Sequence, residues 1–173
     1  MDELTRLLLD AADGDRMALS GFVRATQADV WRFCAHLVDP ATADDLTQEV
    51  YLRAMRSAAR FRGDASAKTW LFSIARRTAA DEIRRRRRRR RLPEPEPEPV
   101  ADDAELIALH QLIDTLEPGR REAFVLTQVV GLPYAEAAEV CGVPLGTIRS
   151  RVARARAELV DHLVAAEADG GAS

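Results

Sequence analysis

Cysteine, aromatic residues and long apolar runs are scarce in this sequence of 173 residues. The two cysteines, Cys34 and Cys141, lie far apart with no CxxC or HxxxC spacing, which disfavours a disulfide scaffold or a zinc site and favours a reduced cytosolic protein. We expect both to be small buried apolar residues. Nothing at the N-terminus resembles a signal peptide, and no apolar run approaches membrane-spanning length. The sequence therefore predicts a soluble intracellular protein without a membrane partner.

Motifs for catalysis are lacking as well. The sequence contains no phosphate-binding loop, no paired-histidine metal motif and no spacing that suggests a Ser–His–Asp arrangement. His36 has no second histidine or acid pair nearby in the sequence, so we interpret it as an ordinary helix residue. We expect no enzymatic activity, no metal site and no cofactor.

The chain is rich in Ala, Leu and Arg, and long β-branched runs are almost absent, which favours an all-α protein. Its formal net charge of −3 hides strong alternation along the sequence. Residues 60–91 carry thirteen basic and three acidic side chains, whereas residues 92–118 carry eight acidic side chains and no basic one. Residues 1–59 are acidic, and 119–160 are weakly basic. These blocks, and not the global charge, inform on nucleic-acid binding.

The stretch from Pro133 to Arg156, PYAEAAEVCGVPLGTIRSRVARAR, has the pattern of a helix-turn-helix. A short helix leads to a turn at Gly142, and Pro144 suits the first position of the second helix. The second helix is expected to bury one stripe and to leave its arginines outside, as a helix in the major groove requires. A solvated basic face is the alternative, but the complete motif favours DNA binding. The stripe consists of Leu145, Ile148, Val152, Ala155 and Leu159, and the arginines are Arg149, Arg151, Arg154 and Arg156.

Four helices are predicted before residue 92. The first two span Asp2–Asp13 and Arg16–Val38, and the third spans Ala43–Ala59 with Thr42 as its N-cap in a capping-box-like start. A fourth helix begins near Ser66 and carries Trp70, Leu71, Phe72, Ile74 and Ala75. The aromatic residues beside Lys68 and Arg76 suit stacking on single-stranded DNA, or they belong to a core; composition leaves both interpretations open.

Residues 84–91 are eight consecutive arginines, and like charges four residues apart oppose a helix there. The segment 92–101 alternates proline with glutamate and favours an extended spacer. Beyond it we expect helices over 103–116 and 120–130, separated by Pro118 and Gly119, which pack behind the helix-turn-helix. The predicted organisation is two small helical domains, 1–91 and 102–165, joined by the linker 92–101 and followed by a disordered tail at 166–173.

Three stretches together resemble one protein family. The segments DDLTQEVYLRA (44–54), FRGDASAKTWLFSIARRTAADEIRR (61–85) and GTIRSRVARAR (146–156) are similar to the extracytoplasmic-function (ECF) sigma factors, group 4 of the sigma-70 family of bacterial RNA polymerase. Their order, spacing and total length also match. The resemblance implies an all-α fold of two domains, a sigma2-like bundle and a sigma4-like helix-turn-helix module. It implies that the chain binds core polymerase and directs promoter-specific initiation.

The resemblance also implies residue roles. The segment at 44–53 matches the one that docks on the clamp coiled coil of the largest polymerase subunit, and the C-terminal module matches the one that grips the flap of the second-largest subunit. The loop at 61–66 matches the one that captures a flipped base of the −10 element, and the helix after it matches the one that contacts the melted strand. The implied core-binding residues are Asp44, Asp45, Leu46, Gln48, Glu49, Val50 and Arg53. Those implied for the −10 element are Phe61, Arg62, Gly63, Asp64, Ser66, Lys68, Trp70, Arg76 and Arg77. Those implied for the −35 element are Pro144, Gly146, Thr147, Arg149, Ser150, Arg151 and Arg154.

Within that resemblance Trp70 is expected to pack behind the loop, and Lys68, Arg76 and Arg77 to contact phosphates. The family linker runs through the active-site cleft, so Glu94, Glu96 and Glu98 either occupy the path of nascent RNA or form a solvated spacer. The arginine run either grips DNA or forms a basic hinge. Family members often have an anti-sigma factor, which adds such a protein to the expected partners. The alternative function is a helix-turn-helix repressor or activator that binds a palindromic duplex alone, as a dimer.

Overall fold

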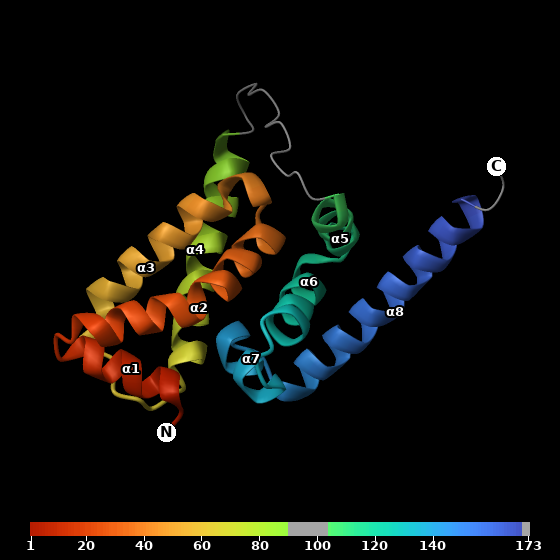
Figure 1. Cartoon of the computed structure of the whole chain (residues 1–173). Coiled ribbons are helices and arrows are strands. Elements are labelled where there is room, and N and C mark those ends of the chain that lie inside the picture. Colours follow the sequence, from red (N-terminus) through yellow and green to blue (C-terminus); the bar gives the residue numbers. More distant parts are fainter. Residues whose placement is uncertain (90–103, 171–173) are drawn as a thin grey trace.

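The protein folds into an N-terminal domain, α1–α4, and a C-terminal domain, α5–α8, that pack side by side (Figure 1). The computed structural model describes residues 1–89 and 104–170, and within these ranges it contains helices and no strands. The linker at 92–101 lies outside the described residues. None of the described helices combines the length and the apolar character needed to cross a lipid bilayer.

Helices α1 (Glu3–Ala12) and α2 (Arg16–Leu37) form the first hairpin of the N-terminal domain. The carboxylate of Asp2 caps α1 by accepting from the amide of Thr5, and Asp15 caps α2 by accepting from the amides of residues 17 and 18. Gly14 between them has φ +102°, a conformation that glycine adopts without a steric penalty. Both helices agree with the sequence prediction within one residue at either end.

The start of α3 (Ala43–Ala58) differs from the sequence prediction. Thr42 makes no side-chain cap. A short 3₁₀ turn, η1 (Pro40–Thr42), precedes the helix, and Asp39 accepts from both the amide and the hydroxyl of Thr42. The capping-box prediction is therefore wrong, because the side chain of Asp39 competes for the groups of Thr42 and closes a tighter turn first.

Helix α4 (Ala67–Arg89) continues well into the arginine run. Acidic side chains on one face of the helix offset the repulsion between like charges. Arg84 pairs with Asp81, and Arg86 pairs with both Glu82 and Asp39. These ion pairs, one of them to Asp39 at the start of η1, stabilise the helix across a stretch where like charges alone would oppose it.

The core of the N-terminal domain settles the two interpretations of the aromatic residues on α4. Phe72 is fully buried and meets Phe33 edge-on, with ring centroids 5.4 Å apart. Trp70 is half-buried and packs on Phe61, with centroids 5.3 Å apart. Phe72 is therefore a core residue, and Trp70 supports the loop that ends at Ser66.

The C-terminal domain consists of α5 (Ala104–Asp114), α6 (Pro118–Phe124), the π-helical turn η2 (Val125–Val129), α7 (Tyr134–Cys141) and α8 (Leu145–Gly170). The predicted break between the first two helices lies at residues 115–117, and Pro118 opens α6 two residues before the predicted start. Glu117 accepts from the amides of Gly119 and Arg120, and Pro118 takes the first helical position, where its missing N–H costs nothing. Leu109 belongs to the apolar pattern of α5, but its side chain is 45% exposed and not buried in the domain.

The predicted helix-turn-helix is present, with Pro144 directly before the second helix and not at its first position. Gly142 has φ +65° and ends α7, and the carbonyl of Pro144 accepts from the amides of Thr147 and Ile148 to start α8. Four residues of the predicted stripe on α8 are buried: Ile148, Val152, Ala155 and Leu159. Helix α8 projects beyond the body of the domain (Figure 1) and ends at Gly170. The tail predicted at 166–173 is therefore helical as far as residue 170, as the helix propensity of its alanines favours.

The two domains share one apolar cluster. Helix α4 packs against α7, and α2 packs against η2 and α5. Most buried apolar residues of both domains, from Phe72 on α4 to Ala137 on α7, belong to one continuous cluster, whereas Leu116, Ala155 and Leu159 form a second, smaller one. We call this packing of the two domains against each other the closed arrangement. It determines which of the predicted functional residues are accessible.

Candidate nucleic-acid interface

The loop between α3 and α4 presents polar groups on an apolar support. Arg62, Gly63 and Asp64 are exposed, whereas Phe61 is 7% exposed beneath them. Gly63 has φ +78°, and a side chain there would be strained. The loop rests on α1, because the hydroxyl of Thr5 accepts from the amide of Ala67 at 3.0 Å.

Thr5 is an anchor that the sequence did not single out. Its hydroxyl donates to a carboxylate oxygen of Asp2 at 2.7 Å, and the side chain is 3% exposed. A polar residue inside the apolar pattern of the first helix was the available signal, since buried hydroxyls need partners.

The α4 residues next to this loop contact the C-terminal domain. Ser66 donates to a carboxylate oxygen of Glu136 at 2.7 Å, and Thr69 donates to the same oxygen. Arg76 Nε lies 2.6 Å from Glu122 Oε1. Ser66 and Arg76, both predicted to contact the −10 element, are thus engaged between the domains.

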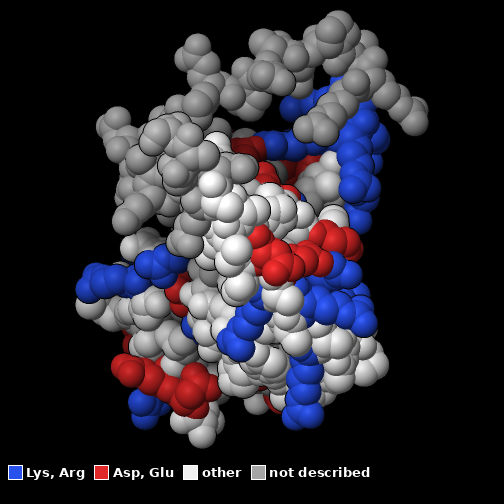
Figure 2. Space-filling model, turned by 90° about the vertical axis from the view of Figure 1, so that its right-hand side faces the viewer, with Lys and Arg blue, Asp and Glu red and all other residues white. Residues whose placement is uncertain are grey.

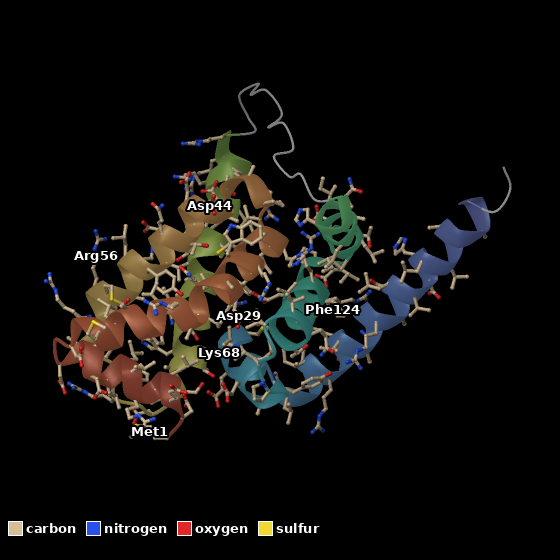
Figure 3. The ribbon with its side chains drawn as sticks, viewed as in Figure 1. Met1, Asp29, Asp44, Arg56, Lys68 and Phe124 are labelled. Carbon is tan, nitrogen blue, oxygen red and sulfur yellow. The ribbon has the colours of Figure 1, made fainter. Side chains whose placement is uncertain are left out.

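Lys68, the only lysine of the chain, is held in the same way. Its ammonium donates to the carbonyl of Val130 at 2.8 Å and pairs with Asp29 of α2 at 2.9 Å. Figure 3 labels Asp29 and Lys68, which come from α2 and α4 and lie close together. Arg77, in contrast, is exposed. Of the residues predicted to contact the −10 element, Ser66, Lys68 and Arg76 are therefore engaged between the domains, whereas Arg77 and the loop residues 62–64 are exposed.

No pattern in the sequence indicated that Glu122 and Glu136 would be the acidic partners of these residues. They lie in different helices of the C-terminal domain, and only the packing of the two domains brings them to α4. The ion pair with Glu122 raises the pKa of Arg76, since a hydrogen bond to a carboxylate favours the charged form.

The face of α8 predicted to read the −35 element is largely open. The exposed residues are Pro144, Gly146, Arg149, Ser150 and Arg154. Thr147 is half-buried, as is Arg151. Arg151 points back toward α6: a Cβ added to Gly119 would lie 3.2 Å from its Cζ. It does not share the outer surface with the other arginines of α8, contrary to the pattern of the sequence.

The polar face predicted on α3 is only partly free. Asp45 and Gln48 are exposed. Asp44 accepts from the indole N–H of Trp31 at 2.8 Å, and Glu49 pairs with Arg53 at 2.7 Å. Arg53 also pairs with Asp81 of α4, and Leu46 and Val50 are buried beneath the face.

Beside Asp45 and Gln48 lies a groove that the sequence did not indicate. It has a volume of about 420 Å³ and is mostly apolar. Leu52, 53% exposed, borders it together with Tyr51, Met55 and Val23. Leu52 lies off the buried stripe of α3, and an apolar residue at that position was the signal for an apolar contact surface.

Charge is segregated on the surface. Figure 2 shows groups of Lys and Arg side chains separated by acidic ones on the face it presents.

Among the described residues, no group of three or more His, Cys, Asp or Glu side chains is arranged to hold a metal ion. Both cysteines are buried, and burial raises the pKa of each thiol to about 12.

In comparison with known protein families, each domain matches one family model, and both models belong to the same family. The model of Sigma-70 region 2 matches residues 22–89, and that of Sigma-70, region 4 matches residues 106–159. The ECF RNA polymerase sigma factor SigC of Mycobacterium tuberculosis is 48% identical over 167 residues, which cover 92% of this chain and 90% of the relative. The chain belongs to the ECF sigma factors.

Other relatives and solved structures agree. The RNA polymerase sigma-H factor of Pseudomonas aeruginosa is 32% identical over 86% of each chain. CnrH, solved in complex with the cytosolic domain of CnrY, superposes with a TM-score of 0.79 at 28% identity and covers 95% of this chain and 99% of its own. The sigma factor RpoE of Bartonella quintana, solved with the anti-sigma factor NepR, gives a TM-score of 0.73 at 27% identity over 84% of this chain and 96% of its own.

Membership of this family establishes the general function. The ECF sigma factor binds core RNA polymerase and directs transcription from specific promoters, with region 4 carrying the helix-turn-helix. The dimeric repressor is not favoured by these comparisons. The all-α fold with two domains is confirmed.

Proposed function

We propose that the ECF sigma factor docks on core polymerase through the exposed face of α3. Asp45 and Gln48 would meet the basic clamp coiled coil, and Leu52 with the adjoining groove would receive apolar side chains. Acidic groups beside an exposed apolar rim suit an amphipathic helical partner. The buried side chains of Leu46 and Val50 support this face, and Arg53 fixes it to α4 through its ion pair.

The −10 element would be read by the loop at 61–66 together with α4. Flipping a base out of the stack costs a few kcal/mol, which a pocket and stacking contacts must offset. Arg62, Asp64 and Arg77 are available for this contact, whereas Ser66, Lys68 and Arg76 become available only when the C-terminal domain leaves α4.

The exposure of these surfaces suggests an order of events. The α3 face is open in the closed arrangement, while the cationic side of α4 is covered. Polymerase therefore binds first, the domains separate, and the −10 element binds last. The single observation that carries this proposal is the use of Lys68 and Arg76 in contacts between the domains.

The −35 element would be read by α8, through Arg149, Ser150 and Arg154 in the major groove and Thr147 at a phosphate. In the separated state Arg151 joins them. The N-terminal helices of the C-terminal domain would grip the flap.

Three further expectations belong to the same proposal. The protein has no catalytic activity of its own and acts in the cytoplasm, where polymerase is found. An anti-sigma factor binds it, as the anti-sigma factor NepR binds the sigma factor RpoE of Bartonella quintana in their complex. The domain bounds are 1–91 and 102–165, which enclose the family matches at 22–89 and 106–159.

A pair of assays tests the proposal. Run-off transcription with core enzyme and a promoter library should give specific transcripts, and the free protein should bind duplex DNA weakly. Lys68→Gln should reduce open-complex formation, measured by permanganate reactivity of the −10 thymines, without reducing affinity for core. The proposal would be contradicted if the free chain bound a palindromic duplex tightly as a dimer.

A further inference from the structure

A cavity of about 540 Å³ lies between the two domains, where the second half of α4 faces α6 and the start of α8. Five of its lining residues are arginines drawn from three helices, and the one acidic residue is Glu122. The arginines are Arg76, Arg86, Arg87, Arg121 and Arg151.

The positive charge of this cavity is only partly balanced. Arg76 pairs with Glu122, Arg86 pairs with Glu82 and Asp39, and Arg121 pairs with Asp114. Among the described residues neither Arg87 nor Arg151 forms an ion pair within 4 Å, although the carboxylate of Glu117 lies near Arg151. Arg121 also donates to the carbonyls of Asp114 and Leu116, so its guanidinium is largely engaged. The excess positive charge of the site therefore comes mainly from Arg87 and Arg151.

The arrangement points to a ligand with several negative charges. Guanidinium groups bind phosphate oxygens through two parallel hydrogen bonds, and arginine is the residue typical of phosphate recognition. The volume lies within the range of small-molecule sites. Arginines on three helices exceed what a single phosphate can contact, which favours a chain or cluster of phosphate groups.

We propose that the cavity between the domains binds a small polyphosphorylated molecule that holds the domains together. Such a ligand neutralises charges contributed by both domains and stabilises their contact. It also competes with promoter DNA for Arg76 and Arg151. The proposal depends on the closed arrangement and not on the assigned DNA roles, so tests on the free chain separate its failure from that of the proposed function.

The first test is calorimetric titration of the free full chain with inorganic tripolyphosphate at fixed ionic strength. We expect one ligand per chain and at least about tenfold weaker binding in the double variant Arg87→Gln/Arg151→Gln, since charge-assisted hydrogen bonds are lost. The matched control is Arg88→Gln/Arg156→Gln, which removes the same charge from the same two helices outside the cavity. Equal losses in the two double variants would assign the anion to the exposed arginines in general and overturn the proposal.

The second test follows the thiol of Cys141, which lines the cavity and is 5% exposed. In a Cys34→Ala background, where Cys141 is the only thiol, saturating tripolyphosphate should slow its modification by a thiol reagent about tenfold, because separation of the domains is suppressed. The double variant Arg87→Gln/Arg151→Gln should show no protection. An unchanged rate in the unsubstituted arginine background would show that the anion does not hold the domains together.

Discussion

Arg76 of region 2 and Glu122 of region 4 form an ion pair across the domain contact, with Nε and Oε1 2.6 Å apart. We proposed that Arg76 contacts the melted promoter strand. If it does, the same guanidinium cannot do both at once, and the free energy of the ion pair would oppose DNA binding.

Glu122→Gln should raise the affinity of the free protein for a single-stranded −10 oligonucleotide by about fivefold, because a partly exposed ion pair contributes up to about 1 kcal/mol. Fluorescence anisotropy measures the change. Glu139→Gln, on the exposed side of α7, serves as the control and should leave the affinity unchanged. Equal gains in both variants would indicate a general charge effect.

Leu52→Ala should weaken binding to core polymerase by about tenfold, since docking buries most of an exposed leucine side chain. Surface plasmon resonance with immobilised core enzyme measures it. Met17→Ala removes a side chain that is 80% exposed on α2, away from the groove, and should have no effect. The prediction fails if the two variants bind alike.

Arg149→Ala should reduce discrimination between a cognate −35 duplex and unrelated DNA by about 1–3 kcal/mol, as expected for loss of a contact to a base edge. Competition binding with the holoenzyme gives both affinities. Equal loss on the two duplexes would show that Arg149 contacts only phosphate.

Arg86→Gln should destabilise the N-terminal domain by about 1–3 kcal/mol, because Glu82 and Asp39 lose a hydrogen-bonded cation in a poorly hydrated position. Although burial of Asp39 favours its neutral form, the bonds from Arg86 and Thr42 keep its pKa below the ordinary value. Urea unfolding is the measurement. Arg88→Gln on the exposed side of the same helix should change the stability by less than about 0.5 kcal/mol.

His36 predicts a pH dependence of stability. It is 3% exposed, and burial, followed by the nearby charge of His110, lowers its pKa from 6.5 to about 4. Arg121 and Arg32 act in the same direction, and Asp114 opposes them. The unfolded chain accepts a proton near pH 6.5 that the folded chain resists. The stabilisation is therefore complete above that pH and is lost as the pH falls toward 4.

Between pH 7 and pH 5 the folded protein should lose about 2 kcal/mol through His36. Urea unfolding of wild type and His36→Phe at both pH values isolates this contribution, since the variant lacks it. His162→Phe, at an exposed position of α8, should retain the wild-type slope. An identical pH slope in wild type and His36→Phe would refute the assignment.

The sequence predicted the helices well where one residue type at one position decides the outcome. Gly14 and Gly142 adopt the left-handed backbone that marks the ends of their helices, and the Ile148–Val152–Ala155 stripe is buried as its spacing indicates. The prediction for Thr42 was wrong because groups compete: Asp39 binds the amide and hydroxyl of Thr42, which does not cap α3. The predicted break near Pro118 is present, and α6 begins two residues before the predicted start.

The candidate functional residues also divide into those whose positions the sequence predicted and those whose contacts it did not. The positions of Arg149 and Arg154 on the open face of α8 follow from helical periodicity alone. That Arg151 turns toward Gly119, and that Lys68 donates to the carbonyl of Val130, could not be predicted. These contacts join residues more than thirty positions apart in the sequence, and no local pattern encodes them.

The sequence by itself determined the helices, the two domains, the helix-turn-helix and the family, because these depend on periodicity, turn residues and motifs within short segments. The tertiary structure decided which cations are free to meet DNA. Charges attract whichever opposite charges the packed apolar surfaces bring near, and here the contacts of α4 with α7 and of α2 with η2 place the cations of region 2 against carboxylates and carbonyls of region 4.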